Sequence, residues 1–301
     1  MKLLLFGANG QVGTELRRFL RPLGEVVACG QEEIDLADLQ NLASEIHNIS
    51  PSVIVNAAAY TAVDRAESEP EIAEIINVDA VGVMANEASR LNIPLIHYST
   101  DYVFDGTNSG LYLENDKTNP LSVYGKTKLQ GENEIRSSGC KHLIFRTSWV
   151  YAKNGSNFPK TMLRLSQEQE ELRVVNDQHG VPTSASLIAS VTANCIGKLS
   201  EEYFNFEQTS GTYHLTPSGK TNWYEIAKFV LEESQLLGTK LRVSPDMVQP
   251  VPSTAFPTPA IRPANSLLDS QKIKTTFGVN LPPWQEDVRK FVKEMSKKVV
   301  L

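Results

Sequence analysis

One N-terminal stretch decides the fold of this 301-residue chain: Lys2-Leu-Leu-Leu-Phe-Gly-Ala-Asn-Gly-Gln-Val-Gly13. Residues 2–6 are an apolar run of strand length, and residues 11–20 follow with the spacing of an amphipathic helix. A strand, a glycine-rich turn and a helix, in that order, form the context that a dinucleotide-phosphate loop requires.

The three glycines of this turn have separate physical roles. Gly7 permits the tight turn, Gly10 lets the backbone approach a pyrophosphate, and Gly13 lets the helix pack onto the strand. The helix N-terminus adds unpaired N–H donors and a favourable dipole. The turn therefore favours a dinucleotide site, with an ordinary glycine-rich turn as the alternative interpretation.

Downstream of this turn, strand-like and helix-like segments alternate as far as residue 150. This alternation predicts a Rossmann-like, doubly wound parallel sheet that binds ligands at the carboxyl ends of its strands. The expected strands are residues 25–29, 52–56, 94–98 and 142–146, and the expected helices are 39–48, 70–91 and 121–135.

Past Trp149 the pattern loosens into loops rich in Pro, Asn and Thr. We expect residues 1–150 to form the dinucleotide-binding domain and residues 151–301 to form mainly a smaller α/β substrate-binding lobe. Two segments, 172–176 and 211–215, are candidates for strands that return to the main sheet. Helices are expected at 158–167, 184–199, 223–233 and 284–297.

Composition excludes several other classes of protein. The net charge is −6 and no basic run exceeds Lys297-Lys298, so nucleic-acid binding has no electrostatic support. No apolar stretch approaches the length of a membrane span, and the chain opens into a strand instead of a signal region. Cys29, Cys140 and Cys195 lack metal-ligand spacing, which predicts buried, reduced thiols in a cytoplasmic protein.

Tyr124 and Lys128 lie four residues apart, a spacing that places both side chains on one face of a helix. A free phenol has a pKa of about 10, and a neighbouring ammonium favours the phenolate. The pair therefore predicts a tyrosine that serves as an acid or base. A chance pair on a helix surface is the alternative interpretation.

Two predicted strand ends carry residues that suit a cofactor or a substrate. Ala57, Ala58 and Ala59 follow the third strand, and their small side chains would let a ribose and an adenine lie against the backbone. At the end of the fourth strand, a hydroxyl of Ser99 or Thr100 would donate a hydrogen bond to a reacting carbonyl oxygen. Alternatively, these hydroxyls only cap the strand and start a turn.

Several motifs together resemble the extended short-chain dehydrogenase/reductases, and within them the dTDP-4-dehydrorhamnose reductase family. The similarity runs without large gaps from residue 1 to about residue 290. The motifs that carry it are the glycine-rich turn, Asn56-Ala-Ala-Ala-Tyr-Thr-Ala-Val-Asp64, Ser99-Thr-Asp-Tyr-Val-Phe-Asp-Gly106, Tyr124-Gly-Lys-Thr-Lys128, Phe145-Arg-Thr-Ser-Trp-Val-Tyr151, Asn157-Phe158 with Thr161-Met162, and Pro257-Thr-Pro-Ala-Ile-Arg-Pro-Ala-Asn-Ser266.

This resemblance implies an enzyme that reduces the C4 ketone of dTDP-4-dehydro-L-rhamnose with NADPH or NADH. The product, dTDP-L-rhamnose, would serve cell-surface polysaccharide synthesis. Tyr124 would donate the proton, Thr100 would bond the same oxygen, and Lys128 would hold the nicotinamide ribose and lower the phenol pKa. Such donors act where negative charge develops.

The resemblance also assigns binding residues. Asp101 and Trp149 match positions that line the sugar site, Arg262 and Lys160 are candidates for the diphosphate, and Asn157 is a candidate for sugar or phosphate. The expected cofactor site comprises Gly7, Asn9, Gly10, Gln11, Val12, Gly13, Asp35, Leu36, Ala57, Ala58, Ala59, Tyr124 and Lys128.

At two places the sequence departs from the family pattern, so the family's cofactor preference and its metal-bridged dimer cannot be assumed here. The second strand runs into Gly30-Gln31 with no acid before Glu32, so we expect both NADPH and NADH to serve. Some relatives dimerise through a divalent metal held by glutamates. Glu15 matches one of these, but Ser186 takes the place of its partner, so we expect no metal and a monomer or weak homodimer.

Two other functions stay open at this point. One is a different nucleotide-sugar 4-ketoreductase, with another sugar or the opposite stereochemistry at C4. The other is a non-catalytic regulatory subunit of the same fold. Since such subunits tend to lose the proton donor or its lysine, the presence of Thr100, Tyr124 and Lys128 favours an enzyme.

Overall fold

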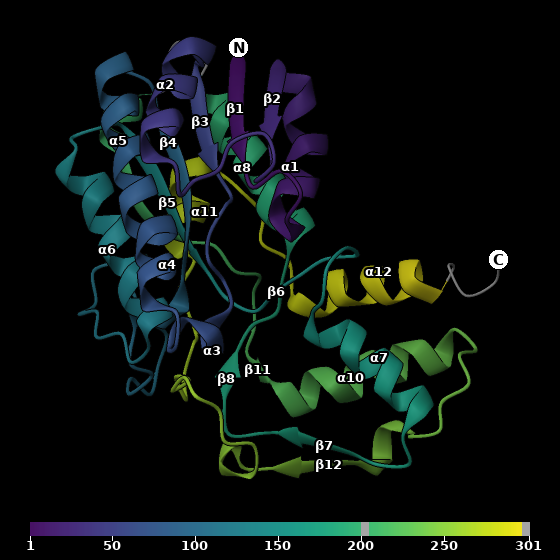
Figure 1. Ribbon diagram of the computed structural model, residues 1–301. Coiled ribbons are helices and arrows are strands. Elements are labelled where there is room, and N and C mark those ends of the chain that lie inside the picture. The colour runs from purple at the N-terminus through teal and green to yellow at the C-terminus, as the bar shows by residue number, and fades with distance from the viewer. Residues whose placement is uncertain (200–204, 297–301) are drawn as a thin grey trace.

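The computed structural model describes residues 1–199 and 205–296, and a parallel sheet of six strands forms its centre (Figure 1). The strand order is β10-β5-β4-β3-β1-β2, so the order reverses at β1, as in a doubly wound sheet. These strands are β1 (Lys2–Phe6), β2 (Glu25–Cys29), β3 (Val53–Asn56), β4 (Leu95–Thr100), β5 (His142–Thr147) and β10 (Gly211–His214). The predicted fold class and all five predicted N-terminal strands are confirmed.

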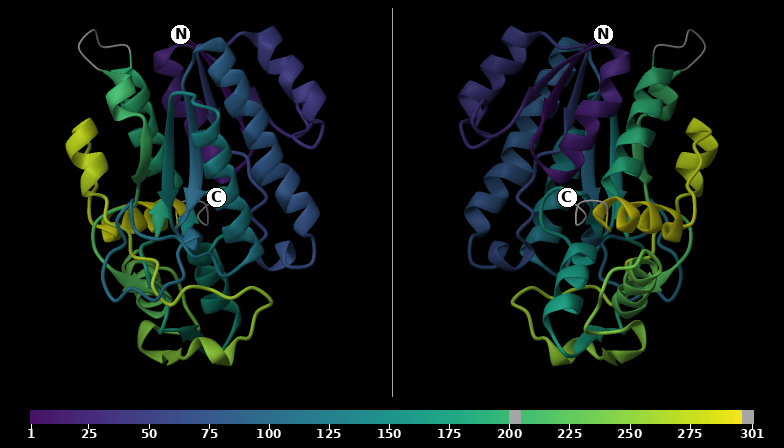
Figure 2. Two further views of the ribbon diagram at one scale, coloured as in Figure 1. Left: turned by 90° about the vertical axis from the view of Figure 1, so that its left-hand side faces the viewer. Right: turned by 90° about the vertical axis from the view of Figure 1, so that its right-hand side faces the viewer.

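Helices cover both faces of the sheet (Figure 2), and successive residues of β1 show why. Leu3 and Leu5 point into one apolar core and Leu4 and Phe6 into the other, because side chains alternate along a strand. One core is closed by α1 (Gln11–Leu20), α8 (Ala185–Lys198) and α11 (Gln271–Phe277), and the other by α2 (Leu39–Ile49), α5 (Ala80–Leu91) and α6 (Val123–Ser137).

The long helix expected over residues 70–91 contains a π-helical turn. It begins as α4 (Pro70–Glu74), widens over Ile75–Asp79 and continues as α5. The side chain of Asn77 in this turn bonds both backbone groups of Tyr60, at 2.9 and 3.1 Å, and donates to Thr127 Oγ1 at 3.2 Å. The wide turn therefore fixes the chain that follows β3 against α6.

A second lobe lies at the carboxyl ends of the strands (Figure 1). Its core is built on α7 (Phe158–Glu168), α10 (Trp223–Leu236) and α12 (Trp284–Ser296). It also holds three two-stranded sheets: β7 (Leu172–Val175) with β12 (Val248–Val251), β6 (Val150–Tyr151) with β9 (Thr183–Ser184), and β8 (His179–Gly180) with β11 (Thr221–Asn222). The remaining short elements are α3 (Val63–Ala66), α9 (Phe206–Thr209) and the 3-10 turns Arg21–Leu23, Asp101–Val103, Pro245–Met247 and Ser253–Ala255.

The two segments expected to return to the main sheet behave differently. Gly211–His214 pairs with β5 and becomes an edge strand, as predicted. The same prediction for residues 172–176 is wrong, because Leu172–Val175 pairs in parallel with Val248–Val251 inside the second lobe. The apolar residues Leu172 and Val174 fit either sheet, and only the partner strand, distant in sequence, decides between them.

The expected helices of the C-terminal half are all present, with ends that differ by at most three residues. Residue 297 of the expected helix 284–297 lies outside the described residues. Cys29, Cys140 and Cys195 are buried free thiols, as predicted. Within residues 1–199 and 205–296, no helix has the length and apolar character needed to span a bilayer.

Candidate active site

A cavity of about 960 Å³ opens at the carboxyl ends of β1, β2, β3 and β4, where they face the second lobe. A doubly wound sheet binds its ligands at this edge. Most residues of the predicted site line it: Gly7, Asn9, Gly10, Gln11, Val12, Asp35, Leu36, Ala57, Ala58, Ala59, Thr100, Asp101, Tyr124, Lys128 and Trp149.

The glycine-rich turn is shaped for a phosphate group. Gly7 has a left-handed φ of +73°, and the Gly10 N–H donates to the Gly7 carbonyl at 3.0 Å. A Cβ on Gly13 would lie 2.0 Å from the same carbonyl oxygen, so Gly13 packs the helix onto the turn and does not line the cavity. Gly10 caps α1 without any side-chain hydrogen bond, which leaves N–H donors for a pyrophosphate. These residues fit a dinucleotide.

The structure brings an unexpected acid to the adenosine end of the cavity. The Gly30 N–H donates to the carboxylate of Glu33 at 2.7 Å, so this side chain folds back to the end of β2. In the sequence, Glu32 is the first acid after the strand. A carboxylate three residues past the strand is within reach of Gly30 when the chain turns there, and this spacing was the available signal.

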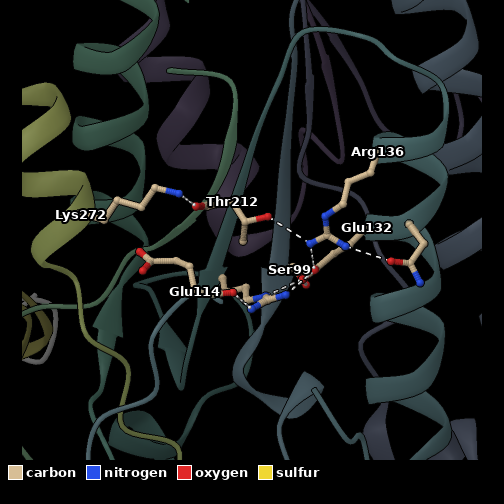
Figure 3. Close-up of polar contacts among 8 residues, drawn as sticks. Ser99, Glu114, Glu132, Arg136, Thr212 and Lys272 are labelled. Atoms are coloured by element: carbon tan, nitrogen blue, oxygen red, sulfur yellow. Dashed lines mark hydrogen bonds and ion pairs between the residues drawn. The ribbon is translucent and has the colours of Figure 1, made fainter. Parts of the chain in front are cut away.

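The structure also decides between the two hydroxyls at the end of β4. Ser99 Oγ donates to Glu132 at 2.6 Å, on the side of the strand facing α6. Figure 3 shows Ser99 and Arg136 meeting at the buried Glu132, which also pairs with Arg146 at 2.7 Å. Ser99 therefore belongs to a buried ion network, whereas Thr100 lines the cavity and also caps the turn that follows, since its Oγ1 accepts from the Tyr102 N–H at 3.1 Å. The role of Thr100 toward a substrate stays a prediction.

Thr100 links the acid beside it to the catalytic candidate on α6. Its Oγ1 donates to Asp101 Oδ1 at 3.0 Å, and a hydrogen bond between Thr100 and Tyr124 lowers the phenol pKa. Burial opposes this effect more strongly and raises the pKa of Tyr124 to about 12. The phenol is therefore protonated at neutral pH and has a proton to donate.

Lys128 does not produce the electrostatic effect that its spacing predicted. Burial lowers the pKa of Lys128 to about 8, against an opposing contribution from Glu132. Its Nζ lies 3.1 Å from His97 Nε2, so its bonding partner is a ring from β4. The expectation that this ammonium pulls the phenol pKa down is wrong for the described residues, because desolvation disfavours the charged form of both groups.

His97, which the sequence pattern predicts only as part of a strand, is a neighbour of the site. It is fully buried, and burial lowers its pKa well below the ordinary value. Its Nδ1 lies 3.1 Å from Asn56 Nδ2, while Asn56 Oδ1 accepts from the Ala58 N–H at 3.0 Å. A hydrogen-bonded chain thus connects Lys128 through the sheet to the backbone that lines the cavity.

The wall of the cavity near the second lobe is aromatic and acidic. Burial raises the pKa of Asp101 to about 6, and hydrogen bonds from Ser266 and Thr100 oppose this shift. Its buried Oδ2 has no partner among the described residues. Trp149 lines the cavity as predicted, and Trp223, which the sequence analysis placed only in a helix, lines it too.

Three further candidates for substrate binding lie outside the lining of the cavity. Asn157 caps α7 and donates to Gln11 Oε1 at 3.0 Å and to a backbone carbonyl. Arg262 forms an ion pair with Asp64 at 2.7 Å. Lys160 donates to two backbone carbonyls of the loop before α7. Their roles toward the substrate stay predictions.

The expected absence of a bridging metal also stays a prediction, although its surroundings are now defined. Glu15 pairs with Arg18 at 2.7 Å, and the same guanidinium lies 3.4 Å from Ser186 Oγ. A cation of the protein itself thus occupies the space between these two positions. Within residues 1–199 and 205–296, no cluster of three or more His, Cys, Asp or Glu side chains is arranged to hold a metal.

The sheet, the glycine-rich turn and the arrangement of Thr100, Tyr124 and Lys128 define the class of protein as an extended short-chain dehydrogenase/reductase. Solved structures agree with this fold. A UDP-glucose 4-epimerase from Thermus thermophilus in complex with NAD has a TM-score of 0.78 at 17% identity, covering 97% of this chain and 98% of that chain.

The chain belongs to the family described as the RmlD substrate binding domain, whose model matches residues 1–297. It is similar to the dTDP-4-dehydrorhamnose reductase of Escherichia coli K12, with 48% identity over 303 residues and 98% of both chains covered. A relative of the same name from Burkholderia thailandensis is 44% identical and covers 98% of this chain and 99% of its own.

Two crystal structures of enzymes with this name superpose along almost the whole chain. The enzyme from Clostridium acetobutylicum has a TM-score of 0.89 at 34% identity, covering 98% of this chain and 99% of that chain. The enzyme from Bacillus anthracis, solved in complex with NADP, has a TM-score of 0.85 at 32% identity, covering 97% of this chain and 99% of that chain.

Proposed function

We propose that this protein is an NAD(P)H-dependent dTDP-4-dehydrorhamnose reductase. It reduces the C4 ketone of dTDP-4-dehydro-L-rhamnose to the alcohol of dTDP-L-rhamnose, the last step in making that sugar for cell-surface polysaccharide. The observation that carries the proposal is the meeting of Thr100, Tyr124 and Lys128 at the cavity. The family membership of nearly the whole chain supports the same activity.

The turn Gly7–Gly13, Asp35-Leu36 and the alanines Ala57, Ala58 and Ala59 hold the dinucleotide, which when bound supplies the hydride. Asp35 and Leu36 lie at its adenine end, and Lys128 at its nicotinamide ribose. The neutral state of the buried phenol suits reduction, because the Tyr124 proton must pass to the oxygen that the hydride leaves negatively charged. One hydride and one proton convert the ketone to the alcohol.

Thr100 orients the same oxygen. Its hydroxyl accepts from the Tyr102 N–H at 3.1 Å and donates to Asp101, so its position is fixed before the substrate arrives. The hydroxyl carries one proton, so bonding the developing alkoxide requires this proton to turn from Asp101 to the substrate oxygen, while the Tyr102 N–H keeps Oγ1 in place. Asp101 and Trp149 line the sugar side of the cavity.

We assign residues 1–150 to dinucleotide binding and residues 151–301 mainly to the substrate. Arg262 and Asn157 lie next to the cavity wall and are our candidates for the diphosphate and the sugar. A guanidinium suits paired phosphate oxygens, and for Arg262 this requires release or sharing of Asp64.

We place the enzyme in the cytoplasm, as a monomer or weak homodimer. Three buried free cysteines suit a reducing compartment. The net charge of −6 gives no basis for a nucleic-acid partner.

The test is incubation with enzymatically made dTDP-4-dehydro-L-rhamnose and NADPH, or NADH, followed by identification of the product sugar. We expect dTDP-L-rhamnose in an amount equal to the cofactor oxidised. Formation of the C4 epimer, or turnover of only another nucleotide-linked ketosugar, would replace this assignment with a different 4-ketoreductase. Absence of any cofactor oxidation with intact binding of the sugar would indicate a regulatory subunit.

A further inference from the structure

Trp149 has a backbone conformation that its side chain does not favour. Its φ is +48°, in the left-handed region, where bulky residues are rare. The other described non-glycine residues with positive φ are Ser50 and Asn92, each of which ends a helix, where this conformation is common. Trp149 follows β5 and ends no helix, so its surroundings must hold it there.

Gly180 on β8 supplies one of these surroundings. A Cβ built on Gly180 would lie 2.6 Å from Cζ2 and 2.7 Å from Cε2 of the Trp149 indole. The φ of Gly180 is not left-handed, so this position needs a glycine for space and not for backbone conformation. The six-membered ring of Trp149 therefore packs directly on the backbone of β8.

Trp223 supplies the other. Its ring stacks on Trp149 with centroids 3.8 Å apart and planes inclined by 22°. Trp223 is itself held, since its Nε1–H donates to Gln178 at 3.2 Å and its ring contacts Phe158 at 4.7 Å. As the first residue of α10, it follows the N-cap Asn222, which accepts from the Glu225 N–H.

Both indoles line the same cavity as Tyr124 and Thr100. Trp284, in contrast, is a tryptophan of the lobe core. It is 4% exposed, packs edge-on against Phe229 in the lobe core and does not line the cavity. The Nε1–H of Trp149 has no hydrogen-bond partner within the described residues and is not among the buried unpaired atoms, so this donor is free for a ligand.

We propose that Trp223 is a positioning residue of the substrate site, which together with Gly180 holds the Trp149 indole in its strained conformation as the wall for a nucleotide-linked 6-deoxy-4-ketohexose. The inference rests on the proposed function. Trp223 and the Gly180 backbone both lie against the Trp149 ring, so the sugar meets the part of the indole that lines the cavity, where its methyl and ring C–H groups pack without leaving a hydroxyl unpaired. The C-terminal lobe thereby contributes to binding through a residue that acts on Trp149.

The experiment compares Trp223→Leu, Trp223→Phe and Gly180→Ala with the core control Trp284→Phe. For Trp223→Leu and Gly180→Ala we expect the KM for the nucleotide sugar to rise about tenfold, with kcat changed less than about threefold. The Kd for NADPH should stay the same, because the cofactor turn is untouched. Trp223→Phe keeps an aromatic ring against Trp149, so its KM for the nucleotide sugar should stay close to that of the wild type.

Gly180→Ala keeps the proposal testable even if Trp223→Leu folds poorly. It preserves both indoles and displaces only that of Trp149, which the added Cβ would meet. A KM for the sugar that stays within about twofold of wild type in both variants would overturn the proposal, as would an equal rise in the Trp284→Phe control.

Circular dichroism tests the geometry separately from the activity. Two indoles stacked at this distance couple their electronic transitions and give a pair of bands of opposite sign. These bands should vanish in Trp223→Phe and Trp149→Phe and persist in Trp284→Phe. Bands that persist without Trp223 would overturn the stacked arrangement. If the wild type shows the bands but turns over no dTDP-linked ketosugar, the proposed function fails while the positioning by Trp223 stands.

Discussion

The two halves of the cavity are built in opposite ways. The cofactor half is made by neighbours in sequence: Gly10 bonds Gly7, and Gly13 packs on the same carbonyl. The substrate half is made by residues from separate elements: Trp149 after β5, Gly180 on β8 and Trp223 on α10. A local motif carries the first half, whereas the second exists only after the lobes have packed together.

This difference separates the residues that can change during adaptation to a new sugar from those that cannot. A side chain on Gly13 would collide with backbone, so the cofactor turn tolerates almost no substitution. On the substrate side, the neighbours are mostly side chains, which can be exchanged in pairs. We therefore expect sugar specificity to depend on residues of both parts of the chain, Trp149 before residue 151 and Gly180 and Trp223 after it, and the hydride chemistry to depend on the first domain.

The largest expected effect lies where the two halves meet, at Tyr124. Tyr124→Phe should lower kcat by about 10²–10⁴, because only the hydroxyl transfers the proton. The Kd for NADPH should change little, since the ring stays in place. Stopped-flow turnover and cofactor titration measure the two quantities. A kcat within a few-fold of wild type would show that another group donates the proton.

A substitution of Asp101 tests whether this residue of the substrate half lowers the free energy of unfolding. The pKa of its carboxyl is raised from 3.8 to about 6 by burial, so ionisation costs the native state free energy. This cost is absent below about pH 4 and complete above about pH 6. Asp101→Asn should therefore be more stable than wild type at pH 7, by about 2–3 kcal/mol, and should lose that advantage at pH 4.

Urea unfolding of both proteins at the two pH values checks this prediction, and turnover is measured in parallel. We expect the variant to bind the sugar less well, since Asp101 lines the cavity and its Oδ2 has no partner among the described residues. A variant that is less stable than wild type at pH 7 would mean that the carboxylate is well solvated in the native protein.

A smaller effect is expected at the adenosine end of the cofactor half. Glu33→Gln keeps the acceptor for the Gly30 N–H but removes a negative charge that would repel a 2′-phosphate. The ratio of kcat/KM for NADPH to that for NADH should rise about fivefold to tenfold. Glu32→Gln is the matched control, because no hydrogen bond joins the Glu32 side chain to the described residues. Equal ratios in the two variants would place Glu33 away from the ribose.

No effect at all is expected from magnesium. Arg18 already lies between Glu15 and Ser186, and one carboxylate holds magnesium only weakly. Light scattering and turnover should therefore be equal in EDTA and in millimolar magnesium. A mass that doubles with magnesium, or activity lost in the chelator, would reveal ligands that the described residues do not bring together.

The sequence was sufficient for those parts of the molecule that depend on local patterns. Apolar runs and the Gly7–Gly13 spacing predicted the sheet and the cofactor turn, and the i, i+4 spacing placed Tyr124 and Lys128 on one helical face. It was insufficient where burial or a distant partner decides. The phenol pKa depends on desolvation, which spacing does not report, and Leu172–Val175 takes its partner from residues 248–251.

The direction in which a side chain points could not be predicted from the sequence either. Ser99 and Thr100 are adjacent and chemically alike, yet Ser99 bonds the buried Glu132, because successive residues of a strand point to opposite faces. The places of Glu33 and Trp223 could not be predicted for a related reason. Glu33 bonds Gly30, a residue of the cavity lining, and Trp223 lines the cavity itself, in both cases through a turn of the chain whose direction the linear pattern does not fix.

The position of β10 at the edge of the main sheet has a consequence for biosynthesis. Until residues 211–214 leave the ribosome, β5 has an open edge, and α11, which helps to close one face of the sheet, emerges later still. An unpaired edge beside exposed apolar surface is a template for aggregation. A fragment of residues 1–150, which lacks β10, α8 and α11, should therefore precipitate in sedimentation assays where the full chain stays dispersed.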